Sequence, residues 1–492
     1  MLGMCLRISR RGLALAAACA LVTAAAAAAQ APTVVDPRLE VNTAADGLTT
    51  PISIAFMGPD DMLVLEKDTG RVKRVTGGVV GATVLDLAVN NASERGLLGI
   101  ALHPRFADNG FVYLYWTETL DGAADSNALD NVPLLGNRVD RFVWDEDAET
   151  LTFDRNLIQL RAFQADANQP LRGNHDGGVL RFGPDGRLYV VIGDNGRRGQ
   201  LQNLEDGPFG PGIPDDAFGG PEPDDAHLTG VILRLADDGS TPPENPFFAA
   251  GAAIGSEVGE NIQKIYAYGL RNSFGMAFDP LSGALWEQEN GDDSFSEVNR
   301  ADPGFNSGWV QIMGPPERIG QFKAIETDPT APQPLTPNGY FGLQQVRWSP
   351  ENIADSPTEG LDRLFELPGS HYSAPELSWK FEVAPGGIGF LGSRALGPQY
   401  RGDLFVAGAR PFLEGGHIFR LELTGNRRSI AVDDPRLADR VADNVSKWEI
   451  TESESLLFGR DFGVGTDVQT GPDGNLYVVS LTKGAIYRIE RR

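Results

Sequence analysis

The chain has 492 residues, and its 67 acidic residues outnumber its 42 basic ones, giving a formal net charge of −25 at pH 7. A surface this acidic repels phosphate, which excludes nucleic-acid binding and docking on anionic membranes. Hydrophobic residues make up 41% of the chain, which is enough for a large buried core. The 59 glycines and 33 prolines indicate many turns.

Residues 1–30 are predicted to be a signal peptide. A basic start with Arg7, Arg10 and Arg11 precedes an alanine-rich apolar run and an Ala-x-Ala type cleavage region. The basic start also resembles a twin-arginine export signal, and a membrane anchor is the alternative interpretation. We therefore expect a periplasmic or secreted protein whose mature part, residues 31–492, has no membrane span.

Both cysteines of the chain, Cys5 and Cys19, lie in this predicted signal peptide. The mature part is therefore expected to have no disulfide, no thiol nucleophile and no cysteine-ligated metal.

A phrase made of a turn and a strand recurs along the chain. Its clearest copies are 182–194 and 470–482, each a Pro-Asp-Gly turn that leads into an apolar, β-rich strand. Looser copies begin at Ala55, Ala101, Ala277 and Ala395. Six copies without a long helical pattern between them predict an all-β fold, a single six-bladed β-propeller with long inserted loops at 199–226 and 311–375. Two β-sandwich domains are the alternative.

Two polar clusters flank the copy at 182–194. His175 lies in the glycine-flanked loop Asn174-His-Asp-Gly-Gly178, where a histidine can act as a general base near neutral pH. Asp194 follows the strand and can orient that histidine through a hydrogen bond. The alternatives are a histidine that only packs its loop and an Asp-Asn-Gly sequence that only makes a turn.

Two further clusters flank the copy that begins at Ala277. Arg271 and Asn272 stand at the edge of an apolar strand, where a guanidinium can polarise a carbonyl or bind a carboxylate. The acidic loop 289–297 is rich in the oxygen ligands that suit calcium. A surface ion pair and a solvated acidic loop are the respective alternatives.

Several common catalytic motifs do not occur in the sequence. It has no Gly-x-Ser-x-Gly elbow, no His-Glu-x-x-His and no Gly-x-x-x-x-Gly-Lys phosphate loop. A Rossmann-type Gly-x-Gly-x-x-Gly between a strand and a helix is also missing, which makes a nicotinamide-dependent enzyme a poor interpretation.

Several phrases, in this order, resemble the glucose/sorbosone dehydrogenase family, which includes aldose sugar dehydrogenases dependent on pyrroloquinoline quinone (PQQ). The resemblance covers roughly residues 40–490. The phrases are Gly96-Leu-Leu-Gly-Ile-Ala-Leu-His-Pro104, Asn174 to Gly178, Phe182 to Gly196, Gly230 to Leu235, Pro243 to Pro246, Gly269 to Asn272, Glu297 to Asn299 and Asn306 to Trp309.

The resemblance implies roles for the residues that match these phrases. His175 takes the proton of the substrate hydroxyl while hydride moves to the quinone, and Asp194 orients it. Arg271 and Asn272 address the quinone oxygens. The same resemblance implies a calcium ion bound by a loop, and the residues that match that loop are Gly291, Asp292 and Glu297.

The chain departs from the family in the residues that bind the cofactor carboxylates. A lysine late in the family's sequences corresponds to the neighbourhood of Arg410, which is predicted to take its place. Two arginines expected before the last Pro-Asp-Gly turn are missing, because the stretch 463–468 reads Gly-Val-Gly-Thr-Asp-Val. Losing two cations should weaken binding of a tricarboxylate.

The sequence therefore predicts an exported dehydrogenase that depends on PQQ and calcium, oxidises a sugar or alcohol hydroxyl and passes electrons to a separate acceptor. Two alternatives stay open. One is a non-enzymatic propeller that binds a carbohydrate or a protein, and the other is a calcium-dependent, lactonase-like hydrolase.

Overall fold

The structure is a computed structural model, and it describes residues 30–163, 173–196, 226–327, 350–408 and 415–492. The chain divides into two units, Met1–Ala31 and Pro32–Arg492. The predicted signal peptide thus lies outside the described residues, apart from its last position. Within the described residues, no helix combines the length and the apolar character that crossing a membrane requires.

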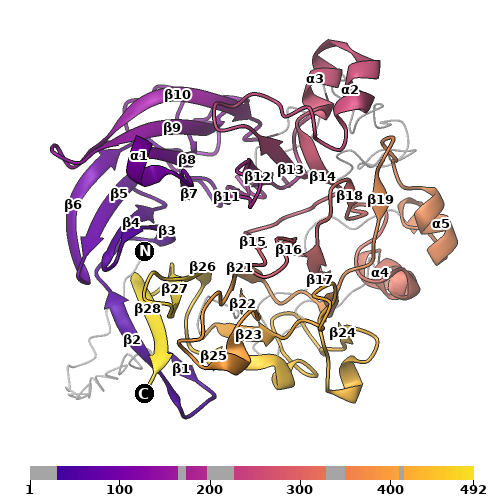
Figure 1. Cartoon of the computed structure of the whole chain (residues 1–492). Coiled ribbons are helices and arrows are strands. Elements are labelled where there is room, and N and C mark those ends of the chain that lie inside the picture. The colour runs from indigo at the N-terminus through magenta and orange to yellow at the C-terminus, as the bar shows by residue number, and fades with distance from the viewer. Residues whose placement is uncertain (1–29, 164–172, 197–225, 328–349, 409–414) are drawn as a thin grey trace, which may run out of the picture. The chain divides into compact units, whose positions relative to one another are not determined.

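The described strands of the second unit form six hydrogen-bonded sheets (Figure 1). The first two contain β3 (Pro51–Gly58), β4 (Asp61–Glu66), β5 (Arg71–Thr76) and β6 (Val79–Asp86), then β7 (Leu97–Leu102), β8 (Phe111–Thr117), β9 (Asn137–Asp145) and β10 (Thr150–Leu160). The third contains β11 (Leu180–Phe182), β12 (Leu188–Ile192), β13 (Val231–Leu235), β14 (Ile265–Tyr268), β18 (Phe305–Asn306) and β19 (His371–Tyr372).

The other three sheets each take a strand from elsewhere in the chain. The fourth contains β15 (Gly275–Phe278), β16 (Leu285–Glu289), β17 (Ser294–Arg300), β20 (Leu377–Phe381) and β24 (Val441–Ala442). The fifth contains β21 (Pro385–Phe390), β22 (Leu404–Gly408), β23 (His417–Leu421), β25 (Leu457–Arg460) and β1 (Thr33–Val34). The sixth contains β26 (Gly465–Thr470), β27 (Leu476–Ser480), β28 (Ala485–Arg491) and β2 (Leu39–Ala45).

Short helices lie in the connections between strands. They are α1 (Phe106–Asn109), α2 (Phe248–Ile254), α3 (Ser256–Ile262), α4 (Ile319–Glu326) and α5 (Pro357–Asp362). The last two belong to the predicted insertion 311–375, of which residues 328–349 lie outside the described part, as does the predicted insertion 199–226 except for its last residue.

The sheets contact one another in a closed circle. Their first strands, β3, β7, β11, β15, β21 and β26, each contact the next, and β26 returns to β3. Strand β2, near the start of this unit, pairs with the C-terminal strand β28, with Val41 opposite Ile489, so the sixth sheet joins segments from near both ends of the unit (Figure 1). The all-β propeller is therefore confirmed as the fold class and the paired sandwiches are wrong, while the number of blades, six, stays a prediction.

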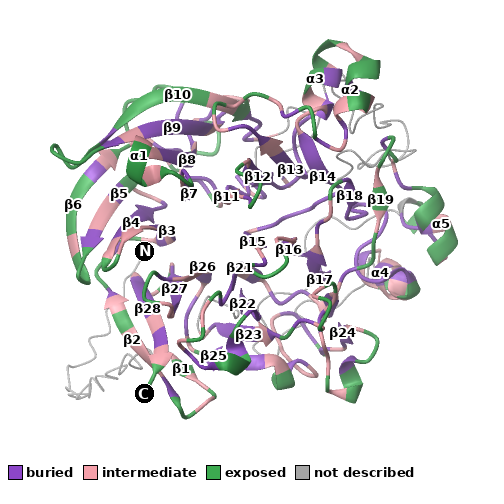
Figure 2. Ribbon diagram, in the orientation of Figure 1, coloured by how far each residue is buried: buried purple, intermediate pink, exposed green. Residues whose placement is uncertain are grey.

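The recurring phrase occupies the same place in each sheet. All six copies lie where the first strand of a sheet turns into the second, as in β11–β12 and β26–β27. Strand β12 is buried on both faces: Leu188, Val190 and Ile192 pack in one core cluster, and Tyr189 and Val191 pack in another (Figure 2). A strand between two neighbouring sheets must be apolar at every position, which explains its unbroken apolar sequence.

Glycines let the first strands of neighbouring sheets approach closely. A Cβ atom on Gly99 of β7 would lie 1.9 Å from the carbonyl oxygen of Gly178, and one on Gly389 of β21 would lie 1.9 Å from that of Val468 in β26. Any side chain at these positions would push two sheets apart.

Strands β16 and β17 bury three carboxyl groups side by side. Glu287 and Glu289 lie on one face of β16, opposite Asn299 and Glu297 of β17. The Asn299 amide donates to Glu287 at 2.8 Å and to Glu297 at 3.0 Å. Burial, together with the neighbouring Glu297, raises the pKa of Glu287 to about 8.

Gly389→Ala should destabilise the protein by about 1–3 kcal/mol or more, because the new methyl group has no room between β21 and β26. The matched control is Gly425→Ala, whose Cβ would meet nothing within 4 Å. Denaturant unfolding measures both variants. Equal stability of the two would contradict the close approach described here.

Glu287→Gln should stabilise the protein at pH 8 by on the order of 1–3 kcal/mol and have little effect near pH 5. A carboxyl whose folded pKa lies above its unfolded one keeps its proton in the fold, so its contribution to stability is full at low pH and declines as pH rises from about 4.5 to about 8. Thermal unfolding across this range tests it, with Glu257→Gln on the exposed face of α3 as control. A pH dependence identical to that of the unsubstituted protein would contradict the burial of a protonated Glu287.

Candidate active site

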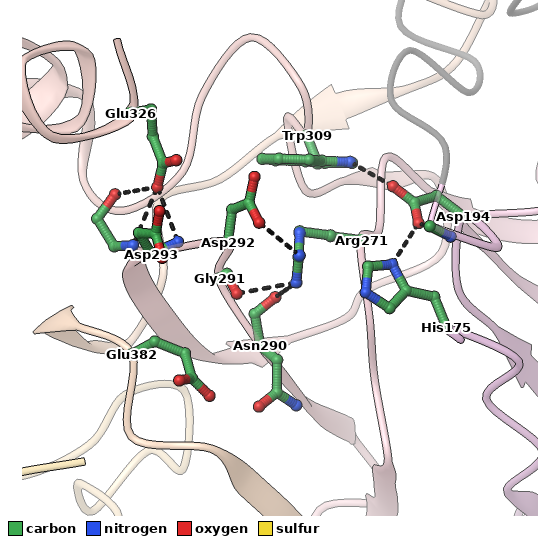
Figure 3. A network of polar contacts seen from close by, with 12 residues as sticks. His175, Asp194, Arg271, Asn290, Gly291, Asp292, Asp293, Trp309, Glu326 and Glu382 are labelled. Atoms are coloured by element: carbon green, nitrogen blue, oxygen red, sulfur yellow. Dashed lines mark hydrogen bonds and ion pairs between the residues drawn. The ribbon is translucent and has the colours of Figure 1, made fainter. Parts of the chain in front are cut away.

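His175 and Asp194 form a buried pair, as predicted. His175 lies in the loop before β11 with a φ of +60°, and Asp194 follows β12. The Nδ1 of His175 lies 2.5 Å from Oδ1 of Asp194, and both side chains are buried (Figure 3). With Asp194 ionised, Nδ1 carries the hydrogen, and Nε2 therefore keeps the lone pair that a general base needs.

Further hydrogen bonds fix the orientation of Asp194. The indole Nε1 of Trp309 donates to Oδ2 of Asp194 at 2.9 Å, and the Gly196 amide donates to Oδ1 at 2.8 Å. The backbone amide of Asp194 donates to the carbonyl of Arg271 at 2.8 Å. Both carboxylate oxygens and the backbone of Asp194 are thus held, which fixes the imidazole ring that the carboxylate contacts.

Arg271 is buried and holds the loop that follows β16. Its Nη1 donates to the carbonyls of Asn290 at 2.9 Å and Gly291 at 2.8 Å, and its Nη2 donates to Oδ1 of Asp292 at 2.9 Å (Figure 3). Burial acts to lower the pKa of Arg271, but the carboxylates of Asp292 and Asp194 outweigh it and raise the pKa. The guanidinium is therefore a permanent positive charge beside the His175–Asp194 pair.

Asn272 supplies an open polar group next to Arg271. The residue is buried, and its Oδ1 has no hydrogen-bond partner among the described residues. Its backbone carbonyl accepts from the Asn290 amide at 2.8 Å, which fixes its position. A buried amide with an unused oxygen is suited to a ligand's polar group.

The three residues predicted to bind calcium do not form a metal site. The Gly291 carbonyl and the Asp292 carboxylate both accept from Arg271. Glu297 lies within β17 and accepts from Asn299 at 3.0 Å and from the Gly314 amide. In the described parts of the chain, no group of three or more His, Asp or Glu side chains is arranged to hold a metal ion.

A cavity of about 320 Å³ lies where the first strands of the sheets converge. Glu94, whose carboxylate accepts from the His175 backbone amide at 2.5 Å, lines it, as does Asn290 from the loop held by Arg271. His175 and Arg271 are thus each one contact away from a residue that lines this cavity. Sequence reasoning missed Glu94, although it stands just before the phrase Gly96-Leu-Leu-Gly, one of those that carry the resemblance.

The two cations on the cavity wall are already paired with acids. Lys67 contacts Asp68 at 2.8 Å, and Arg181 contacts Asp467 at 2.7 Å. From the stretch 463–468, where two arginines were expected, the uncharged Val464 and Thr466 also line the cavity. Arg410, predicted to bind the cofactor, lies outside the described residues.

Comparisons with known proteins extend these observations. The family model "Glucose / Sorbosone dehydrogenase" matches residues 48–341. An uncharacterized protein of Synechocystis is 27% identical over 92% of this chain and 87% of its own length. Quinoprotein glucose dehydrogenase B of Acinetobacter calcoaceticus is 27% identical over 88% of this chain and 83% of its own length.

A crystal structure of the apo form of the aldose sugar dehydrogenase from Escherichia coli has the same fold. It superposes with a TM-score of 0.60 and 23% identity, covering 92% of this chain and 100% of that one. The match of the family model spans more than half of the sequence. The chain therefore belongs to the glucose/sorbosone dehydrogenase family.

Proposed function

We propose that the protein oxidises a hydroxyl group of a sugar or alcohol, with PQQ as its cofactor and a separate electron acceptor. The observation that carries this proposal is the buried His175–Asp194 pair beside a cavity, with Arg271 as a fixed positive charge next to it. Membership of a family of sugar dehydrogenases supports the reaction class.

The roles of the residues follow from their contacts. Nε2 of His175 takes the proton of the substrate hydroxyl, which lets the C–H bond of the same carbon break as hydride. Asp194 keeps the ring oriented and stabilises the imidazolium that forms. Trp309 holds the Asp194 carboxylate in place through the indole hydrogen bond at 2.9 Å.

The residues fit PQQ at its quinone end. Arg271, a fixed cation, and the N–H of the Asn272 side-chain amide would hold the quinone oxygens. The Oδ1 of Asn272, which has no partner among the described residues, suits a donor such as a substrate hydroxyl. PQQ, when bound, supplies the hydride acceptor. Near the carboxylates of PQQ, Lys67 and Arg181 of the cavity wall are the cations that would take the place of the missing arginines. Each of them already pairs with an acid.

The proposed reaction does not depend on calcium. The residues predicted to bind it accept hydrogen bonds from Arg271, Asn299 and the Gly314 amide, and they do not fit a metal ion. No step of the reaction is assigned to it.

The finer details of fold and location belong to the same proposal. Six sheets whose first strands make a closed circle support a six-bladed propeller. The basic and alanine-rich start of the sequence supports export to the periplasm or the medium.

A propeller that binds a carbohydrate or a protein without catalysis is the second candidate. The observation that favours it is the uncharged cavity wall at Val464 and Thr466, where a tricarboxylate would need cations. In that case the cavity would take a neutral, hydroxyl-rich ligand.

His175→Ala should lower turnover in a dye-linked assay of aldose oxidation by about 10²–10⁴-fold, because it removes the general base. Asp194→Asn should also lose turnover strongly, because the ring loses its orientation. The control is His371→Ala, an exposed histidine in β19. Full turnover in His175→Ala would contradict the mechanism.

A further inference from the structure

We propose that the side chain of Lys447, together with Arg271, takes the place of a metal ion in the loop of residues 290–293, so that this loop does not bind calcium. The ammonium of Lys447 donates to Oδ1 of Asp293 at 2.9 Å and to the carbonyl of Asp292 at 3.2 Å. It also lies 3.8 Å from the carboxylate of Glu382.

The loop turns five oxygen atoms toward these two cations. Arg271 donates to the carbonyls of Asn290 and Gly291 and to one carboxylate oxygen of Asp292. Lys447 donates to the carbonyl of Asp292 and to one carboxylate oxygen of Asp293. Carbonyl and carboxylate oxygens in this number are what a hard cation such as calcium uses, but here N–H groups of the protein occupy them.

Burial makes this arrangement obligatory. The side chains of Lys447 and Asp293 are each 1% exposed, so neither charge is open to bulk solvent. Burial acts to lower the pKa of Lys447, but Glu382 and Asp293 outweigh it and raise the pKa, which keeps the ammonium charged. Removing a buried partner leaves the opposite charge uncompensated, which is strongly destabilising.

The loop is also held from its other side. Oε1 of Glu326, at the end of α4, accepts from the amides of Asp293 and Ser294 at 2.9 and 3.0 Å and from the Ser294 hydroxyl at 2.8 Å (Figure 3). The Glu382 amide donates to the Asp293 carbonyl at 3.2 Å. These bonds keep the loop in the shape that the two cations require, without a metal.

Calcium titration of the purified, EDTA-treated full chain tests this assignment, by calorimetry and by thermal unfolding. The melting temperature should be the same in EDTA and in millimolar calcium, and any calcium binding elsewhere should be unchanged in Asp292→Asn. A calcium ion that raises the melting temperature and is lost in Asp292→Asn would overturn the proposal.

Lys447→Met tests the ammonium itself. Its melting temperature should fall well below that of the control Lys323→Met, whose ammonium bonds Asp355 and the Ile353 carbonyl at the surface. A Lys447→Met protein as stable as the unsubstituted chain would overturn the proposal. If this variant does not fold, the calcium titration of the unsubstituted chain still decides. None of these measurements uses turnover, so failure of the proposed enzyme activity would leave them unaffected.

Discussion

One buried residue, Arg271, connects the parts of the site through its backbone and its guanidinium. The backbone carbonyl of Arg271 accepts from the amide of Asp194, its backbone amide donates to Glu289 of β16, and its side chain holds the loop after that strand. Its guanidinium also lies 5.4 Å from the centre of the Trp309 ring, and Trp309 donates to Asp194. The histidine–aspartate pair, the loop and the tryptophan therefore share a single support, and each depends on the others for its position.

The same centre shows how an acidic protein manages buried charge. Carboxylates from four segments lie near the loop 290–293, and the positive charges of Arg271 and Lys447 compensate them. Deeper in the sheet, Glu287 and Glu297 have raised pKa values because burial favours their neutral forms. On the cavity wall, by contrast, Lys67 and Arg181 each pair with an acid, so both cations are already engaged by the protein's own carboxylates.

Much of the fold and the centre of the site could be predicted from the sequence, because both depend on short segments of the chain and on residues close together in it. A turn-and-strand phrase marks the first hairpin of each sheet, and β12 is apolar throughout because it is covered on both sides. His175 and Asp194 flank one hairpin, so the antiparallel pairing of β11 and β12 brings them together.

The cations that contact the loop 290–293 could not be predicted in this way. Lys447 comes from a segment 154 residues beyond Asp293, in a connection with no periodic pattern. The calcium prediction meets the same limit, since local acid content does not reveal which distant cation will neutralise it.

The most direct test of the account is a titration of the purified protein with PQQ, followed by calorimetry and by the quinone absorbance band. Calcium is kept in the buffer, so that the result does not depend on which cation the loop holds. The account predicts saturable binding of one PQQ per chain, with a shifted absorbance band that Arg271→Ala loses. No binding at tens of micromolar PQQ would contradict a quinone-dependent dehydrogenase and would favour a propeller whose cavity binds a carbohydrate.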